Sequence, residues 1–85
     1  MYKNRAEDGR NNICGARIKV YRQKMPGRVS QRQLADMLQI EGMDVDKNAV
    51  QRIENGQRFV TDIELKAIAH VLHVRYEELL DDTEN

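Results

Sequence analysis

The chain has 85 residues, 40% of them hydrophobic, and its 14 Lys and Arg side chains balance 14 Asp and Glu side chains. So short a chain holds one hydrophobic core, and no apolar run approaches the roughly 18 to 20 residues of a membrane span or resembles a signal peptide. The lone cysteine, Cys14, excludes an internal disulfide and fits a reducing compartment. We therefore expect one soluble, cytoplasmic domain.

The zero net charge hides an uneven distribution. Residues 1–58 hold twelve Lys and Arg against seven Asp and Glu, whereas residues 59–85 hold two against seven. Such polarity suits a protein that turns one end toward phosphate groups. The same charges can also decorate the solvated faces of helices, so charge leaves both interpretations open.

The first eleven residues are polar and lack periodicity, which predicts a flexible basic arm over residues 1–11. A first helix is expected from Asn12 onward, because apolar side chains then recur at steps of four, three and four. This apolar stripe consists of Cys14, Ile18, Tyr21 and Met25. Pro26 and Gly27 end the helix.

Two further helices are marked by their ends. Ser30 and Gln33 have the spacing of a capping box, which opens a second helix that Gly42 closes. Asp46 is placed to accept hydrogen bonds from the first amides of a third helix, and Gly56 supplies the left-handed residue just past its end. The inward sides are Leu34, Ala35 and Leu38 in the second helix, and Val50 and Ile53 in the third.

The C-terminal part predicts two more helices and an acidic tail. Thr61 and Glu64 form a second capping box, which opens a fourth helix. Apolar residues continue this helix and indicate a short fifth one: Leu65, Ile68, Ala69 and Leu72, then Tyr76, Leu79 and Leu80. Residues 82–85 form the tail. No segment shows the alternation of a strand, so the chain is predicted to be all-α.

The third helix carries the side chains best suited to contacts outside the fold. At about 100° per residue, its polar side chains fall within an arc of about 140°, nearly opposite Val50 and Ile53. These side chains are Lys47, Asn48, Gln51 and Arg52. Asn and Gln can form bidentate hydrogen bonds with adenine, and Arg and Lys pair with N7 and O6 of guanine. The helix alone does not distinguish a DNA-reading face from an ordinary solvated one.

The order and spacing of these elements resemble the XRE-type, Cro-like phage-repressor family of helix-turn-helix domains. The matching groups are Gly15–Ile18 with Tyr21-Arg22, Ser30–Ala35, Val50–Gly56, and Leu65, Ile68-Ala69, Leu72, Val74 and Leu79-Leu80. The resemblance implies a compact five-helix repressor-like domain over residues 12–81, with the helix-turn-helix formed by the second and third helices. It also implies sequence-specific binding of double-stranded DNA by a bacterial or phage-type transcriptional regulator, with residues 46–55 in the major groove.

The resemblance further implies roles for particular positions. The base-reading residues are the polar face of the third helix: Lys47, Asn48, Gln51 and Arg52. The residues expected to contact phosphates are Gln31, Arg32, Asn55, Gln57 and Arg58. Arg22 and Glu54 correspond to a buried ion pair that links the first and third helices.

One departure from the family pattern concerns the connection between the second and third helices. Ala35 and Glu54 stand 19 positions apart, several more than the family usually has. The additional residues fall within 38–45, which predicts a longer second helix and an enlarged turn. We expect the outward face of the third helix to be unchanged.

The sequence contains no motif that supports metal binding or enzymatic activity. Residues 44–48 imitate the opening of an EF-hand loop, but Ala49 and Asn55 stand where calcium binding needs Gly and Glu. His70 and His73 lack the surrounding ligands of a metal site. There is no phosphate loop and no acid–base pair, so we expect no cofactor, no metal and no enzymatic activity.

Two kinds of partner remain. We expect a repressor that lies with the nucleoid and binds an approximately palindromic operator as a homodimer, so that two reading heads reach successive major grooves. The dimer contact is expected in the C-terminal helix, at Tyr76, Leu79 and Leu80. The alternative is an antitoxin or adaptor of the same fold, whose main partner is a protein bound to this acidic, leucine-rich end.

Overall fold

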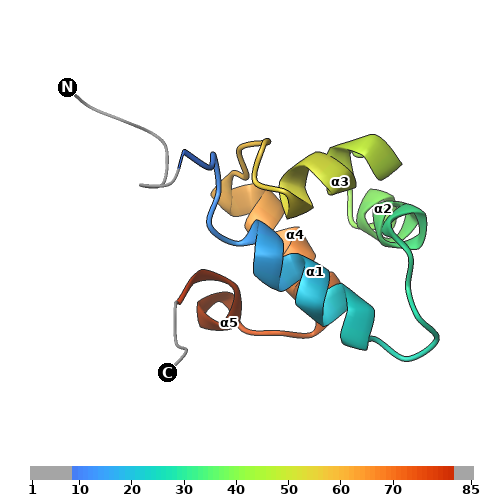
Figure 1. The fold of residues 1–85 in the computed structure, drawn as a ribbon. Coiled ribbons are helices and arrows are strands. Elements are labelled where there is room, and N and C mark those ends of the chain that lie inside the picture. The colour runs from blue at the N-terminus through green and yellow to red at the C-terminus, as the bar shows by residue number, and fades with distance from the viewer. Residues whose placement is uncertain (1–8, 82–85) are drawn as a thin grey trace.

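The computed structural model describes residues 9–81, which form five helices and no strand (Figure 1). The helices are α1 (Gly15–Lys24), α2 (Gln31–Ile40), α3 (Lys47–Glu54), α4 (Asp62–Leu72) and α5 (Tyr76–Leu80). The predicted all-α, five-helix class is confirmed for the described part of the chain. Residues 1–8 of the predicted arm and the predicted tail, 82–85, lie outside the described residues.

Helices α2, α3 and α4 begin where their capping residues predict, whereas α1 begins at Gly15, three residues after the expected start at Asn12. Ser30 Oγ accepts a hydrogen bond from the Gln33 amide at 3.1 Å, and Gln33 Oε1 accepts one from the Ser30 amide at 2.8 Å. Thr61 and Glu64 repeat this arrangement at 3.2 and 3.0 Å. Asp46 Oδ1 accepts from an amide in the first turn of α3 at 2.8 Å. These bonds satisfy amides that a helix start leaves unpaired, so they fix where α2, α3 and α4 begin.

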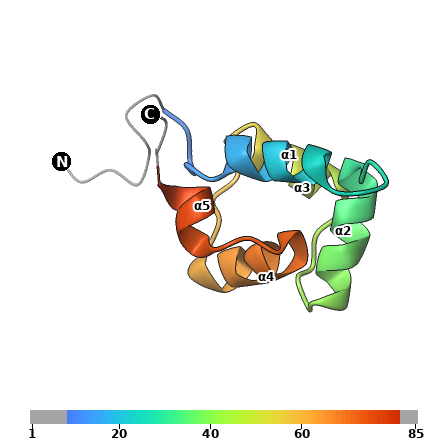
Figure 2. The same cartoon turned by 90° about the horizontal axis from the view of Figure 1, so that it is seen from below.

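The five helices surround one core. In Figure 2, α1 and α3 lie on one side of it, α4 lies on the opposite side, and α2 and α5 close the two ends. The side chains with less than 2% of their surface exposed come from every helix: Ile18, Leu34, Leu38, Val50, Ile53, Ile68 and Leu79. Burying one such side chain contributes about 1.5–3 kcal/mol. Because every helix supplies at least one of them, no helix is peripheral to the fold.

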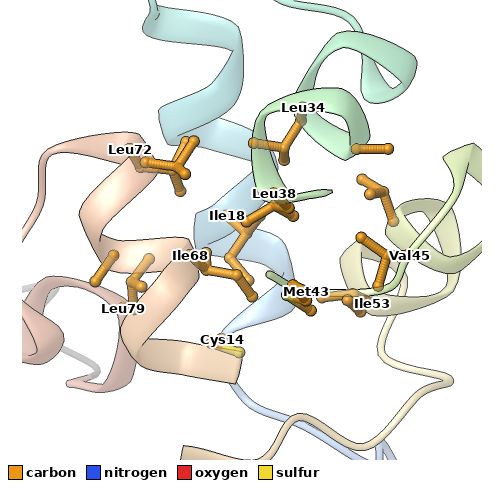
Figure 3. Close-up of a cluster of buried hydrophobic side chains, with 14 residues drawn as sticks. Cys14, Ile18, Leu34, Leu38, Met43, Val45, Ile53, Ile68, Leu72 and Leu79 are labelled. Carbon is orange, nitrogen blue, oxygen red and sulfur yellow. The ribbon is translucent and has the colours of Figure 1, made fainter. Parts of the chain in front are cut away.

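The connection between α2 and α3 is also part of the core. α2 ends at Ile40, and Gly42 adopts a φ of +92° in the turn that follows. Met43 and Val45 are only 6% and 3% exposed, and Figure 3 shows both within the buried cluster. The Gln39 side chain donates a hydrogen bond to the Val45 carbonyl at 2.7 Å. The turn is therefore a packed element, and it sets the position of α3 relative to α2.

The short helix α5 covers the end of the core with a single side chain. Leu79 is 0% exposed, whereas Tyr76 and Leu80 are 49% and 40% exposed. Leu79 therefore does not belong to a dimer surface, which corrects the expectation from the sequence. In so short a helix, the side chain that closes the core cannot also face a partner. Tyr76 and Leu80 remain on the surface.

Candidate nucleic-acid interface

The polar face of α3 points away from the core. Its four predicted base-reading side chains are all exposed: Lys47, Asn48, Gln51 and Arg52. On the opposite face, Val50 and Ile53 are each 1% exposed. The helical period of 3.6 residues explains this division, because positions 47, 48, 51 and 52 share one side of the helix. One face is thus bound to the core, and the other presents two amides and two cations to the outside.

Behind this face, an ion pair joins α3 to α1. Arg22 Nε lies 2.6 Å from Glu54 Oε2, and Arg22 Nη2 lies 3.0 Å from Glu54 Oε1. The two residues are 8% and 7% exposed. Arg22 Nη1 also donates to the Val29 carbonyl at 2.9 Å. Bidentate pairing of this kind neutralises the carboxylate inside the protein, so Glu54 places no unpaired negative charge beside the polar face.

Gln31, the first residue of α2, is held against the same ion pair. Its Nε2 donates to Glu54 Oε1 at 3.0 Å, and the residue is half-buried. Arg32, the next residue, is exposed. Because Glu54 is the last residue of α3, this bond places the start of α2 beside the C-terminal end of α3. The two groups of residues expected to contact phosphates therefore lie at the same end of α3.

The residues after α3 form a tight loop. Gly56 has a φ of +83°, and the amides of Gln57 and Arg58 both donate to one carbonyl in the last half of α3, at 2.8 and 3.2 Å. Asn55 and Gln57 are exposed. Arg58 is half-buried, and its Nη2 donates to Glu64 Oε2 at 3.1 Å. The loop therefore exposes the side chains of Asn55 and Gln57, although Asn55 Oδ1 accepts from the Gln57 amide at 3.2 Å, whereas the charge of Arg58 is shared with α4.

Two asparagines before α1 hold this loop, and reasoning from the sequence missed both. The Asn11 backbone amide donates to the Gly56 carbonyl and Asn11 Nδ2 donates to the Gln57 carbonyl, both at 2.8 Å. Asn12 Nδ2 donates to the Ile53 carbonyl at 3.1 Å and to the Arg58 carbonyl at 2.7 Å. Asn12 Oδ1 also accepts from the Gly15 amide at 2.8 Å. Only this last bond had a local signal, because Asn is a common capping residue just before a helix.

Gly15 allows the start of α1 to rest directly on the end of α3. A Cβ atom at this position would lie 2.0 Å from the Ile53 carbonyl oxygen and 3.1 Å from that of Glu54. Real side chains do not approach a backbone oxygen so closely, so the two helices can meet here only through glycine. The close approach fixes α3 against α1 at the end where the loop begins.

Comparison with protein-family models matches residues 18–79 to a model described as Helix-turn-helix. The match runs from the middle of α1 to α5 and covers well over half of the chain. It includes the enlarged turn and the whole of α3. None of the curated proteins compared matches the sequence. None of the helices within residues 9–81 is long and apolar enough to cross a membrane.

Proposed function

This chain belongs to the XRE-type helix-turn-helix family of DNA-binding transcription regulators, and from this premise we propose that it is a repressor that binds a specific sequence of double-stranded DNA. In this proposal α3 lies in the major groove, with the exposed side chains of Lys47, Asn48, Gln51 and Arg52 against base edges. The observation that carries the proposal is the two-sided character of α3. Its buried face is fixed by the core and by the Glu54 ion pair, and its polar face is exposed along two turns.

Contacts to the DNA backbone come from the residues around the C-terminal end of α3. The backbone amide of Gln31 lies at the N-terminus of α2, where helix amides favour phosphate oxygens. Exposed Arg32 adds a cation, and Asn55 and Gln57 add side chains that can donate to phosphate. Arg58 contributes less than its charge suggests, because Glu64 already pairs with it.

We propose further that two copies meet through the surface between α4 and α5. Ile63 is 79% exposed and lines one groove together with Tyr76, Leu80 and Lys66. The groove is lined by a cation, Lys66, and an acid, Asp62, and a two-fold interface can pair such opposite charges across its axis. A dimer of this kind would bring two α3 helices to successive major grooves, about 34 Å apart.

The dimer surface is tested by the oligomeric state in solution. Ile63→Glu should convert the protein to a monomer in sedimentation velocity, because it places a charge in the apolar lining of the groove. Val20→Glu is the matched control, since Val20 is also an exposed apolar side chain (45%) but lies on α1. A wild-type protein that is monomeric at high concentration would contradict the proposed dimer.

The proposed function is tested by selecting bound duplexes from a random pool and by titrating the selected duplex at two salt concentrations. We expect an inverted repeat with half-sites about one helical turn apart. The logarithm of the binding constant should fall with the logarithm of salt by about 0.9 for each phosphate contacted. If no duplex binds even at low salt, the function fails, and an adaptor that uses the groove between α4 and α5 for a different protein is favoured instead.

A further inference from the structure

We infer that Asn12, supported by Asn11, is a positioning residue for DNA binding. It holds the loop after α3 in the shape that presents Asn55 and Gln57 to the DNA backbone. The inference rests on the proposed function, since it concerns how that function is prepared in the free protein. It adds a role for two side chains that lie before the helix-turn-helix and do not themselves belong to its polar face.

The carboxamide of Asn12 spans the loop from one end to the other. Its Nδ2 donates to the Ile53 carbonyl in the last turn of α3 at 3.1 Å, and to the Arg58 carbonyl at the far end of the loop at 2.7 Å. Its Oδ1 accepts from the Gly15 amide at 2.8 Å. An amide nitrogen has two hydrogens, so both are used on the loop, and the oxygen fixes the side chain to α1.

Asn11 completes this arrangement between the two points that Asn12 holds. Its backbone amide donates to the Gly56 carbonyl and its Nδ2 donates to the Gln57 carbonyl, both at 2.8 Å. Helix ends leave carbonyl groups without partners inside the helix, and water usually satisfies them when they are exposed. Here the carbonyls of Gly56, Gln57 and Arg58 accept from the two asparagines, and the Ile53 carbonyl accepts from Asn12 in addition to the Gly56 amide.

The orientation of these carbonyl groups affects how the loop interacts with an anionic partner such as DNA. A carbonyl oxygen carries partial negative charge and would repel a phosphate that approached it. With the carbonyls turned toward residues 11 and 12, the exposed groups of the loop include the side chains of Asn55 and Gln57, which can donate hydrogen bonds. The asparagine pair therefore makes the loop more suitable for phosphate without contacting the DNA itself.

The same bonds order the loop before DNA arrives. A loop that must be ordered upon binding lowers the affinity, because the conformational entropy is then lost in the binding step. The asparagine pair removes that loss in advance, and the close approach of Gly15 to the Ile53 carbonyl fixes the α3 end of the loop against α1. Loss of the pair should thus weaken binding to every duplex by the same factor and leave sequence preference unchanged.

The test uses Asn12→Ser in the full chain. A serine hydroxyl can still accept from the Gly15 amide, as serine does at helix starts, but it cannot bridge two carbonyls. We expect affinity to fall about tenfold for selected and random duplexes alike. We also expect the Gln57 and Arg58 amides to exchange with solvent faster in the free protein, because their bonds to the end of α3 lose their support.

Val71→Ala is the control for a general loss of stability, since Val71 is buried in α4 and has no bond to the loop. Thermal unfolding of both variants identifies a temperature at which both are fully folded, and binding is compared there. The inference is overturned if Asn12→Ser binds like wild type, or if Val71→Ala loses as much affinity at equal stability. If wild type itself binds no duplex, the proposed function fails and the inference falls with it; that outcome is recognised from the wild-type titration alone.

Discussion

Arg22 and Glu54 bind each other through two parallel hydrogen bonds, at 2.6 and 3.0 Å, and both residues are more than nine-tenths buried. Gln31 adds a third bond to the same carboxylate at 3.0 Å. One side chain of α3 therefore holds residues from α1 and α2. The orientation of the polar face of α3 depends on this carboxylate, although the carboxylate itself is turned away from that face.

Replacing Glu54 by Ala should destabilise the fold by about 3–5 kcal/mol, because the guanidinium of Arg22 would stay buried without an opposite charge. Urea unfolding measures this loss. Glu41→Ala is the control, since Glu41 is an exposed acid at the end of α2 and should contribute less than about 1 kcal/mol. Equal stability of Glu54→Ala and wild type would show that the pair does not support the fold.

The starts of α2, α3 and α4 could be predicted because capping is local. Ser30, Asp46 and Thr61 each bond to an amide three residues later, so the sequence contains both partners side by side. The inner and outer faces of α3 could also be predicted, because the helical period alone decides which positions share a side. These two kinds of evidence were sufficient for the fold class and for the exposed face.

Contacts between distant segments could not be predicted from such local patterns, and the Arg22–Glu54 pair was expected only from the resemblance to the family. The bond from Asn12 to the Arg58 carbonyl spans 46 positions, and no local pattern indicates that these residues meet. The choice between Leu79 and Leu80 for the core depends on how α5 sits against the other helices. Met43 likewise enters the core only because the turn folds back onto it, so its burial is a property of tertiary packing.

Met43→Ala is expected to destabilise the protein by about 2–4 kcal/mol, because its side chain is 6% exposed and its removal leaves a cavity under the turn. Asp44→Ala changes the neighbouring, exposed side chain and should stay within about 0.5 kcal/mol of wild type. Thermal or urea unfolding of both variants provides the comparison. If both were neutral, the enlarged turn would be a loose loop and not a part of the core.

Cys14 should make stability depend on pH in the alkaline range. Burial raises the pKa of the Cys14 thiol above its ordinary value of 9.0. The unfolded chain therefore loses this proton at lower pH than the folded protein does. The stabilising contribution is complete below the unfolded pKa, and it is lost as pH rises toward the folded pKa.

The measurement compares wild type with Cys14→Ala by urea unfolding at about pH 8 and about pH 10. The free energy of unfolding should fall more steeply with pH in wild type, because the other titrating groups are the same in both proteins. In the folded protein the thiol should also react slowly with a thiol reagent at neutral pH, since it is 2% exposed. Identical pH slopes in the two proteins would contradict the effect of burial.

Gln51 and Arg32 should affect DNA binding in different ways. Gln51→Ala removes a predicted base contact, so discrimination at one base pair should fall by about 1–3 kcal/mol while stability stays within about 0.5 kcal/mol of wild type.

Arg32→Ala should weaken binding to all duplexes alike and reduce the salt slope by about one, because it removes an exposed cation proposed to lie near the DNA backbone. Arg32 is the better choice than Arg58, whose charge is shared with Glu64. Fluorescence anisotropy with the selected duplex and its single-base variants, at two salt concentrations, measures both effects. If both variants lose affinity in the same proportion on every duplex, Gln51 does not read a base.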